Sequence, residues 1–531
     1  MTQLTALFAV CLCLFSVPPC EAEQPIQADV LFQGATIYDG TGNPGIEGDL
    51  AVRGDKIVGV GKLPSVRADL TIDCRGLVMA PGFIDLHNHS DRQVIATGTR
   101  AVVNYLTQGC TTIVTGNCGS GPVDVGDYYR KIDAAGVGTN VAHLLPQGSL
   151  RGYVMETAQH APTADELAKM KQLADTAMQD GAWGMSTGLI YVPSSYAQTD
   201  ELTQIAKIVS AHGGIYASHI RNENVRLLAA VDEALKIGKQ AGLPVHISHF
   251  KSSGRDSWGL VRQAAKMIEK ARKEGQQATA DQYPYIASST SLDATLIPTW
   301  ARAGGRKALI GRLDNAEQGP RIRSILANNL KKRNGGESIR IARDPRRQDW
   351  VGKNLAQISA SEKLNPVDLA VLIARTGGAS IVNFSMSEDD VRHIMQIPWV
   401  ATASDGRAYL PGADRPHPRS YGTFARKLGY YSIREKVLPL AQAVRSGSGL
   451  PADILGMQDR GYLKKGNFAD LVVFDPKTFI DAATFDAPHQ YSQGARYVYV
   501  NGKPAIFAGS PTGALSGRAL KHVSAKNDKK D

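Results

Sequence analysis

The central part of the chain alternates short apolar runs with longer stretches in which apolar residues recur at helical spacing. Such runs are typical of buried parallel strands, and the intervening stretches are typical of crossover helices. In residues 163–180, Thr163 and Glu166 have the spacing of a capping box, and residues 258–275 end on a glycine. Eight runs follow this rhythm: GFIDLHNH, TTIVTGNCG, NVAHLLPQ, AWGMSTGLI, GIYASHIR, LPVHISHFK, ATADQYPY and PWVATASDG. We therefore predict an α/β fold with a (β/α)8 TIM-like barrel over residues 81–450.

The two ends of the chain have another pattern, short strand-like segments separated by turn residues. It occupies Ala28 to Val78 and returns in Ala469–Pro476 and Ala495–Gly509. These segments predict one composite β-sandwich domain, built from residues 23–80 and 451–512, into which the barrel is inserted.

Two further segments depart from both of these patterns. Residues of about 288–346 predict an insertion in the barrel, and residues 516–531 predict a disordered tail.

The first residues of the chain have the pattern of a secretory leader. Leu4 to Val17 form an uncharged apolar run that is too short to span a bilayer, and Pro18 and Pro19 follow it. Because a small residue, Ala22, ends this segment, we expect residues 1–22 to be a signal peptide and the protein to be periplasmic or secreted. The alternative is a lipid anchor on Cys20, although the two prolines before this cysteine fit a lipoprotein signal poorly.

Composition narrows the class of protein. The 43% hydrophobic and 21% charged residues are those of a soluble globular enzyme and exclude a disordered or fibrous chain. The net charge of +10 comes without a zinc finger, an RNA-binding signature or a basic stripe with interleaved aromatics, so we expect no nucleic-acid partner. Outside the leader three cysteines remain, Cys74, Cys110 and Cys118. This odd number in an oxidising compartment suggests a chemical role for at least one thiol.

Ligand-type side chains stand at the carboxyl ends of five of the eight runs, where barrel enzymes have their active sites. A lone histidine there is usually a structural residue, a lone cysteine a small buried hydrophobe, and an aspartate beside a glycine a turn residue. Two histidines two residues apart, however, point to the same face of a strand. Six such residues at one end of a barrel together predict a metal site: His87, His89, Cys118, His219, His249 and Asp405.

Imidazole, thiolate and carboxylate ligands together favour zinc, and their number suggests either two adjacent positions or one tight site beside a weaker one. Two close cations need an anionic bridge, for which related barrel hydrolases often use a carboxylated lysine. No lysine lies between Lys62 and Lys131, and none ends the third or fourth run. Cys118 is placed to supply that negative charge, whereas Cys74 and Cys110 are expected to be packing residues.

From Ala28 to about Gly509 the chain resembles the N-acyl-D-amino-acid deacylases, or D-aminoacylases, of the amidohydrolase superfamily. The resemblance rests on PGFIDLHNHSD, TGNCG, ASHIRNE, VHISHFKSSG, TASDG, HPRSYGTF, GNFADLVVFDP and HQYSQGARYVYVNGKP. It implies zinc-dependent hydrolysis of the amide bond of N-acyl-D-amino acids, with Asp405 moving a proton from the attacking water to the leaving amine. It also implies a tight metal on Cys118, His219 and His249 and a weaker one on His87, His89, Cys118 and Asp405.

A deacylase for amino acids must also hold a carboxylate, and three residues match this need: Lys251, Tyr283 and Arg419. Alternatively, Lys251 and Arg419 are solvated charges on loops, and Tyr283 is an aromatic residue of the core. The loop from Asp405 to Arg419 is a few residues longer than the resemblance leads one to expect. Residues 288–300 contain no Lys or Arg, which favours neutral or apolar amino acids as substrates, although Arg302 lies nearby.

Two other functions remain open at this point. One is a cyclic-amide hydrolase of the hydantoinase or dihydroorotase kind, which usually needs the lysine that this chain lacks. The other is a barrel without enzymatic activity that binds metal or serves as a scaffold. We expect a small-molecule substrate and no stable membrane insertion, while the sequence leaves the oligomeric state open.

Overall fold

The computed structural model describes residues 24–523, so the predicted signal peptide lies outside the described residues. All eight predicted runs form parallel strands, which belong to two sheets. The third run is divided between the two sheets as β8 and β9. One sheet contains β6 (Phe83–Asp85), β7 (Cys110–Thr115) and β8 (Asn140–His143). The other contains β9 (Leu145–Pro146), β10 (Gly184–Gly188), β11 (Ile215–His219), β12 (Val245–Ile247), β13 (Ala278–Gln282) and β17 (Val400–Thr402).

Backbone contacts join the two parallel sheets at both sides. On one side β8 leads into β9 with a single residue between them. On the other side the residues after β6 and β17 exchange hydrogen bonds, from the Asp405 amide to the His87 carbonyl and from the His89 amide to the Gly406 carbonyl, each 2.8 Å long. The carboxyl ends of all these strands therefore meet in one region, and the segments that follow them can build a common site.

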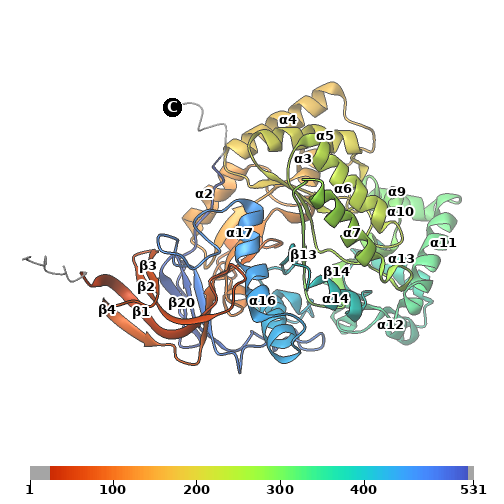
Figure 1. Ribbon diagram of the computed structural model, residues 1–531. Helices are drawn as coiled ribbons and strands as arrows, with labels where there is room; N and C mark the ends of the chain where they lie inside the picture. The colour runs from red at the N-terminus through yellow and green to blue at the C-terminus, as the bar shows by residue number, and fades with distance from the viewer. Residues whose placement is uncertain (1–23, 524–531) are drawn as a thin grey trace, which may run out of the picture.

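Helices cover the outside of the parallel strands (Figure 1). The two helices foreseen in the sequence are α4 (Ala164–Gln179), which begins with the full Thr163–Glu166 capping box, and α7 (Leu260–Lys273). Between them in the chain are α5 (Thr199–Ala211) and α6 (Leu227–Ala241), which pack against α4 and α7. The apolar faces of these helices and the strands share one large buried cluster, so helix packing fixes the positions of the strand ends.

The chain remains with the parallel strands beyond the boundary predicted at residue 450. Helices α16 (Leu440–Gly447) and α17 (Gly449–Leu455) follow the last strand. Leu450, Leu455 and Met457 belong to the same buried cluster as Ile84 and Val114 of the strands. The boundary is therefore displaced to a point after Met457, because the apolar side of α17 is covered by the strands and not by the β-rich part.

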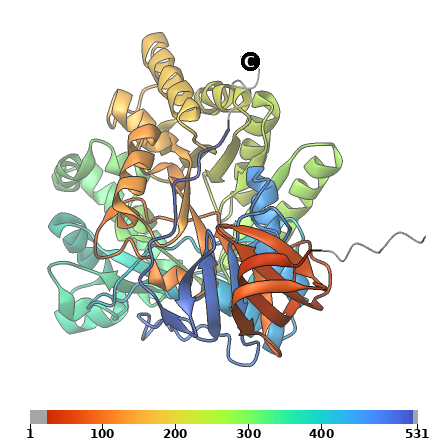
Figure 2. The same cartoon turned by 90° about the vertical axis from the view of Figure 1, so that its left-hand side faces the viewer.

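The two ends of the chain join in a single sheet of nine strands (Figure 2). Their junction is the antiparallel pair of β5 and β18, from Val78 with Phe474 to Pro81 with Leu471. The N-terminal strands are β1 (Ile26–Ile37), β2 (Ile46–Arg53), β3 (Lys56–Gly61), β4 (Val66–Asp73) and β5 (Val78–Pro81). The C-terminal strands are β18 (Leu471–Phe474), β19 (Ala495–Val500), β20 (Lys503–Phe507) and β21 (Ser510–Pro511).

The insertion between β13 and β17 is longer than the predicted residues 288–346. Its strand β14 (Ala287–Ser291) pairs with β16 (Ser380–Phe384), which in turn pairs with β15 (Ile339–Arg343), so the unit closes only at Phe384. It has a hydrophobic core of its own. The sequence pattern missed its extent because the segment consists mostly of short helices: α8 (Leu292–Leu296), α9 (Thr299–Arg302), α10 (Gly305–Asp314), α11 (Gln318–Lys331), α12 (Leu355–Glu362) and α13 (Pro366–Thr376).

The disorder predicted from Ser516 onward is wrong for the described part of that tail. Gly517 and Ala519 form β-bridges with Val137 and Val141, and the indole of Trp183 donates a 2.7 Å hydrogen bond to the Leu520 carbonyl. These backbone contacts give the polar segment a fixed path that its composition does not reveal. Among residues 24–523, no helix has both the length and the apolar character that a membrane crossing needs.

Lys427 is a buried cation that has no hydrogen-bond partner among residues 24–523. Lys427 lies in the π-helical segment η7 (Arg426–Arg434), and its buried Nζ makes no hydrogen bond, so burial lowers the pKa of Lys427 to about 7. Between pH 7 and the ordinary pKa near 10.5 the unfolded chain therefore binds one more proton than the folded chain. The stability contributed at this position consequently rises with pH across that window.

We expect Lys427→Met to raise the free energy of unfolding by a few kcal/mol. This is the order of the energy that corresponds to the difference between the Lys427 pKa values of the unfolded and the folded chain. The gain over the wild type is largest at pH 7 and shrinks toward pH 10, as urea unfolding at several pH values can measure. Lys465→Met, at an exposed position, is the matched control and leaves the pH dependence unchanged. A gain that does not vary with pH would contradict this account of the buried ammonium.

Candidate metal centre and active site

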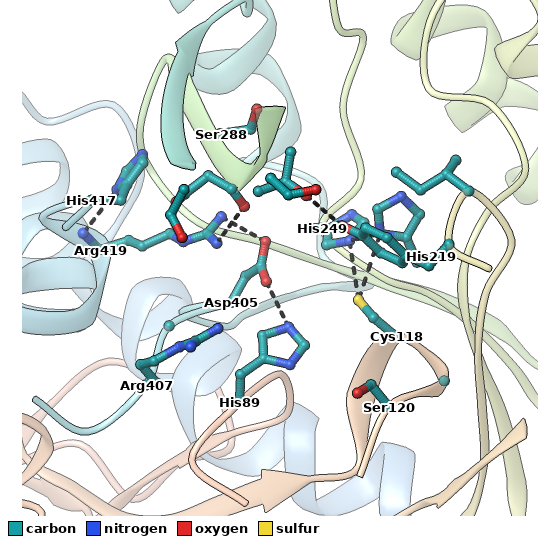
Figure 3. Close-up of a pocket in the computed structure, with 18 of the residues that line it drawn as sticks. His89, Cys118, Ser120, His219, His249, Ser288, Asp405, Arg407, His417 and Arg419 are labelled. Atoms are coloured by element: carbon teal, nitrogen blue, oxygen red, sulfur yellow. Dashed lines mark hydrogen bonds and ion pairs between the residues drawn. The ribbon is translucent and has the colours of Figure 1, made fainter. Parts of the chain in front are cut away.

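The six predicted ligand residues come together at the carboxyl ends of the parallel strands. Figure 3 shows His89, Cys118, His219, His249 and Asp405 around one pocket. Five of them line a cavity of about 630 Å³, while His87 is fully buried behind its wall. The histidine pair follows β6, Cys118 follows β7, His219 ends β11, and the other two follow β12 and β17. Strands that are far apart in the chain thus deliver side chains of one chemical class to one place.

Cys118 lies at the centre of this cluster. Its Sγ is 3.2 Å from His87 Nε2, 3.5 Å from His219 Nδ1 and 3.7 Å from His249 Nε2. Among residues 24–523, two groups of side chains could hold a metal ion, one formed by His87, His89 and Cys118 and the other by Cys118, His219 and His249. The Cys118 thiol belongs to both of these groups.

Asp405 completes the cluster on the side of the histidine pair. Its Oδ1 lies 3.1 Å from His89 Nε2 and 3.6 Å from His87 Nε2. Its Oδ2 accepts a 2.6 Å hydrogen bond from Nη1 of Arg419. Burial alone would raise the pKa of the Asp405 carboxyl, but the charges of Arg419 and His87 outweigh burial and hold it well below its ordinary value.

Three of the six residues have left-handed backbone conformations, which non-glycine residues rarely adopt. The φ angles are +51° at Cys118, +36° at His249 and +50° at Asp405. Each such conformation costs about 1–3 kcal/mol and persists only where the surroundings enforce it. All three lie two or three residues beyond the end of a parallel strand, so the chain turns sharply at these points and directs the side chains into the cluster.

The three cysteines among the described residues differ strongly in their electrostatics. Burial would raise the pKa of the Cys118 thiol, but His87 and the bonds from His219 and His249 outweigh it, and this pKa lies well below its ordinary value. Burial raises the pKa of Cys74 to about 12 and that of Cys110 well above its usual range. The cluster therefore favours a thiolate at Cys118 alone.

The donor set fits a thiophilic cation such as zinc. His219 Nδ1 and His249 Nε2 lie 2.7 Å apart, and both face the sulfur. On the far side of its ring, His249 Nδ1 lies 2.8 Å from both Glu223 Oε1 and Lys251 Nζ. A proton at Nδ1 that is shared with the Glu223 carboxylate would leave the Nε2 lone pair directed at the cluster. The far nitrogen of His219, Nε2, is buried without a hydrogen-bond partner among residues 24–523. Lone pairs and a thiolate that converge in this way require a positive charge.

Three acidic residues that the sequence analysis did not select hold this arrangement in place. Asp281 accepts a 2.7 Å bond from the His249 amide, and its other oxygen lies 2.8 Å from His246 Nε2 and 3.5 Å from His87 Nδ1. Asp85 accepts bonds from the Ser404 amide and hydroxyl. Glu223 is the third. Asp85 and Asp281 each stand two residues before a selected residue, so strand alternation would have placed them on the same face.

The three predicted substrate-binding residues also lie together in the cavity wall. Two cations lie near the Tyr283 ring, with the Lys251 ammonium 5.7 Å and the Arg419 guanidinium 4.8 Å from its centre. Among residues 24–523 the buried Tyr283 hydroxyl has no hydrogen-bond partner. Lys251 Nζ donates to Glu223 Oε1 at 2.6 Å. The longer loop after Asp405 therefore still brings Arg419 to the site, where the Arg419 amide donates to Nδ1 of the buried His417.

Comparison with known proteins agrees with this geometry. Residues 70–506 match the amidohydrolase family. D-aminoacylase of Alcaligenes xylosoxydans xylosoxydans is 36% identical over 94% of this chain and 98% of its own length. N-acyl-D-glutamate deacylase of the same organism is 33% identical over 93% of this chain and 96% of its own length.

Solved structures place these relatives on the same fold. N-acyl-D-glutamate deacylase from Bordetella bronchiseptica, solved with zinc and a phosphonate mimic of the tetrahedral intermediate, has a TM-score of 0.81 at 33% identity and covers 93% of this chain and all of its own. A D-hydantoinase reaches a TM-score of 0.57 at 15% identity, over 93% of this chain and 99% of its own, which shows a shared fold alone. From the family match and the near full-length relatives, we conclude that this chain belongs to the amidohydrolase family.

Proposed function

We propose that this protein is a zinc-dependent deacylase that hydrolyses the amide bond of N-acyl-D-amino acids to a carboxylate and a free D-amino acid. The observation that carries the proposal is the thiol of Cys118, which lies 3.2–3.7 Å from nitrogen atoms of three histidines. Relatives that carry the names D-aminoacylase and N-acyl-D-glutamate deacylase support the substrate class.

In this proposal Cys118, His219 and His249 would hold the tight metal, and His87, His89, Cys118 and Asp405 would hold a weaker one. The thiolate would supply the negative charge that a carboxylated lysine supplies in other barrel hydrolases. Lys251 is the one lysine among the residues that line the cavity, and it is engaged by Glu223. Glu223 and Asp281 orient the histidine rings from the far side, as carboxylates behind metal ligands commonly do.

A zinc ion bound here would polarise the scissile carbonyl and lower the pKa of water at the site. Asp405 would move the proton. Its Oδ1 faces His87 and His89, which leaves Oδ2 to accept the proton of the attacking water and deliver it to the leaving amine. In the structure Arg419 holds Oδ2. A substrate carboxylate that binds Arg419 competes for this guanidinium and frees Oδ2 for proton transfer.

Lys251, Tyr283 and Arg419 would bind the carboxylate that every N-acyl-D-amino acid carries on its α-carbon. Two cations that flank the Tyr283 ring suit a planar anion, because both can reach it together with the unpartnered phenol hydroxyl. Binding there fixes the α-carbon, so the acyl group is directed at the metal cluster. The preference for the D-enantiomer rests on the relatives and not on this geometry.

The rival functions have less support. A cyclic-amide hydrolase shares the fold, but the bridging position is occupied by a thiol and not by a lysine, and the likeness to D-hydantoinase extends to the fold alone. A scaffold protein without catalysis would not need all six ligand-type residues, nor the hydrogen bond between Arg419 and Asp405.

We also infer two finer features of the architecture and one of the location. The two parallel sheets, joined at both sides, are taken to form one closed (β/α)8 barrel. The nine-stranded sheet buries separate apolar clusters on its two faces, which supports its folding into a β-sandwich.

The apolar leader supports export to the periplasm or the medium, which a fractionation experiment with the full-length chain would test.

Chelation should abolish hydrolysis of N-acetyl-D-amino acids, and added zinc should restore it, as an assay of released amine can measure. Cys118→Ala should lower kcat/KM by at least about 100-fold, because loss of a direct ligand exceeds the usual effect of a supporting residue. N-acetyl-L-amino acids are the control substrates. Equal rates for both enantiomers, or full activity without the thiol, would refute the proposed function.

Iodoacetamide should modify Cys118 faster than Cys74 or Cys110 in the metal-free protein, because only its thiol pKa is lowered. Equimolar zinc should suppress this reaction, as mass spectrometry of the alkylated peptides can follow. The other two thiols serve as internal controls. Unchanged alkylation of Cys118 with zinc present would show that the thiolate is not a ligand.

Glu223→Gln should weaken zinc binding about 10–100-fold, since the neutral amide supports the His249 ring less well. A competition assay with a chelator of known affinity measures the change. Glu233→Gln is the matched control, because Glu233 binds Arg221 at 2.9 Å and contacts no residue of the cluster. Equal zinc affinity in both variants would contradict the orienting role of Glu223.

A further inference from the structure

A second cavity, of about 710 Å³, adjoins the cavity that contains the metal cluster. The two cavities share Ile190, Glu223, Ser288 and Thr290 in their walls, so they are neighbours across a thin partition. Loops after the parallel strands form one side of the second cavity, and the insertion forms the other. A substrate held at the metal cluster can therefore extend a group past Thr290 into this space.

The wall of the second cavity carries more positive charge than its own carboxylates neutralise. Arg221 is paired with Glu233, and Glu223 with Lys251. Four further cations in the wall make no salt bridge with any carboxylate of residues 24–523, while Asp256 is the one remaining acidic residue in the wall. These four cations are Arg255, Arg302, Lys332 and Arg333.

Two of these cations are arginines held in place by backbone carbonyls. Arg302 Nη2 donates to the Ile190 carbonyl at 3.0 Å, and Arg333 Nη1 donates to the Asn329 carbonyl at 2.9 Å. Among residues 24–523 the Nε atoms of both are buried without a hydrogen-bond partner, and burial lowers the pKa of both guanidinium groups. Neither arginine forms a direct salt bridge there, although Asp293 is near enough to favour the charge of Arg302. A buried charge without a direct ion pair is costly, so such a pair is suited to an anion that comes from outside.

We propose that the second cavity binds a further carboxylate of the substrate, through Arg302 and Arg333. This inference rests on the proposed function, which already assigns the α-carboxylate to the first cavity and so leaves the charge of the second unused. The additional carboxylate can belong to the amino-acid side chain or to the acyl group. Apolar wall residues, Ile190, Ile297 and Met386, suit the methylene groups that separate it from the amide.

This proposal revises the preference for neutral side chains that residues 288–300 suggested. That expectation rested on residues 288–300, with Arg302 noted nearby, whereas the wall also contains Arg333 from just beyond α11. Arg302 and Arg333 are 31 positions apart in the chain and meet in one wall only through the packing of the insertion.

The test compares kcat/KM for N-acetyl-D-leucine, N-acetyl-D-glutamate and N-succinyl-D-leucine in the zinc-loaded protein. We expect at least one of the two dianionic substrates to exceed N-acetyl-D-leucine about tenfold or more, as a charged hydrogen bond allows. N-acetyl-D-glutamate identifies the side chain as the source of the carboxylate, and N-succinyl-D-leucine identifies the acyl group. The advantage should lie mainly in KM.

Arg302→Gln and Arg333→Gln should each reduce this advantage about tenfold while thermal unfolding remains cooperative. Arg321→Gln, at an exposed position of the same insertion outside both cavity walls, is the matched control. The inference is overturned if neither dianionic substrate is preferred by the wild type, or if the preference survives both substitutions. Hydrolysis of N-acetyl-D-leucine without any such preference rejects this inference alone, whereas no hydrolysis of any of the three rejects the proposed function as well.

Discussion

The cluster of ligand-type residues depends on the sulfur of Cys118, which is buried and which the surrounding charges favour as a thiolate. Burying this negative charge is unfavourable unless it is compensated. Cys118 is 7% exposed and lies among imidazoles, so its charge is stable only where cations compensate it. Neutral histidines cannot do this, and protonated histidines cannot serve as ligands. A bound divalent cation would meet both demands, because it would neutralise the thiolate and accept the nitrogen lone pairs. Burial and charge at Cys118 thus favour a cation at this position independently of the relatives.

The same constraint accounts for features further from the sulfur. The strand ends must turn sharply to direct Cys118, His249 and Asp405 inward, and each turn has a left-handed residue. Hydrogen bonds hold these strained turns: Asp281 binds the His249 amide, and the His87 carbonyl accepts the Asp405 amide. Asp281 also lies beside the ring of His87, so one carboxylate supports both the backbone and a ligand. Strain at the site is therefore sustained by the packed strands beneath it.

Much of this organisation could be predicted from the sequence, because it depends on local alternation. The eight strands and the residues at their ends follow from apolar periodicity, and the capping box of α4 follows from two residues three positions apart. The extent of the insertion could not be found in this way, since pairing of β14 with β16 joins segments about 90 residues apart. The contacts of Gly517 and Ala519 were missed for the same reason. Asp281 and Glu223 escaped notice because their roles depend on which ring each faces.

Chemistry and selectivity are therefore placed on different parts of the fold. The metal cluster is built on the ends of parallel strands, which are held rigid by helix packing on their outer faces. The insertion supplies no ligand, but its strand β14 lies in the wall of both cavities, and its helical part carries Arg302 and Arg333. Because the insertion has its own hydrophobic core, its surface can change without disturbing the strand ends. We assign the cations of the second cavity to recognition, because Arg302 and Arg333 come from the insertion and not from the strand ends that carry the metal cluster.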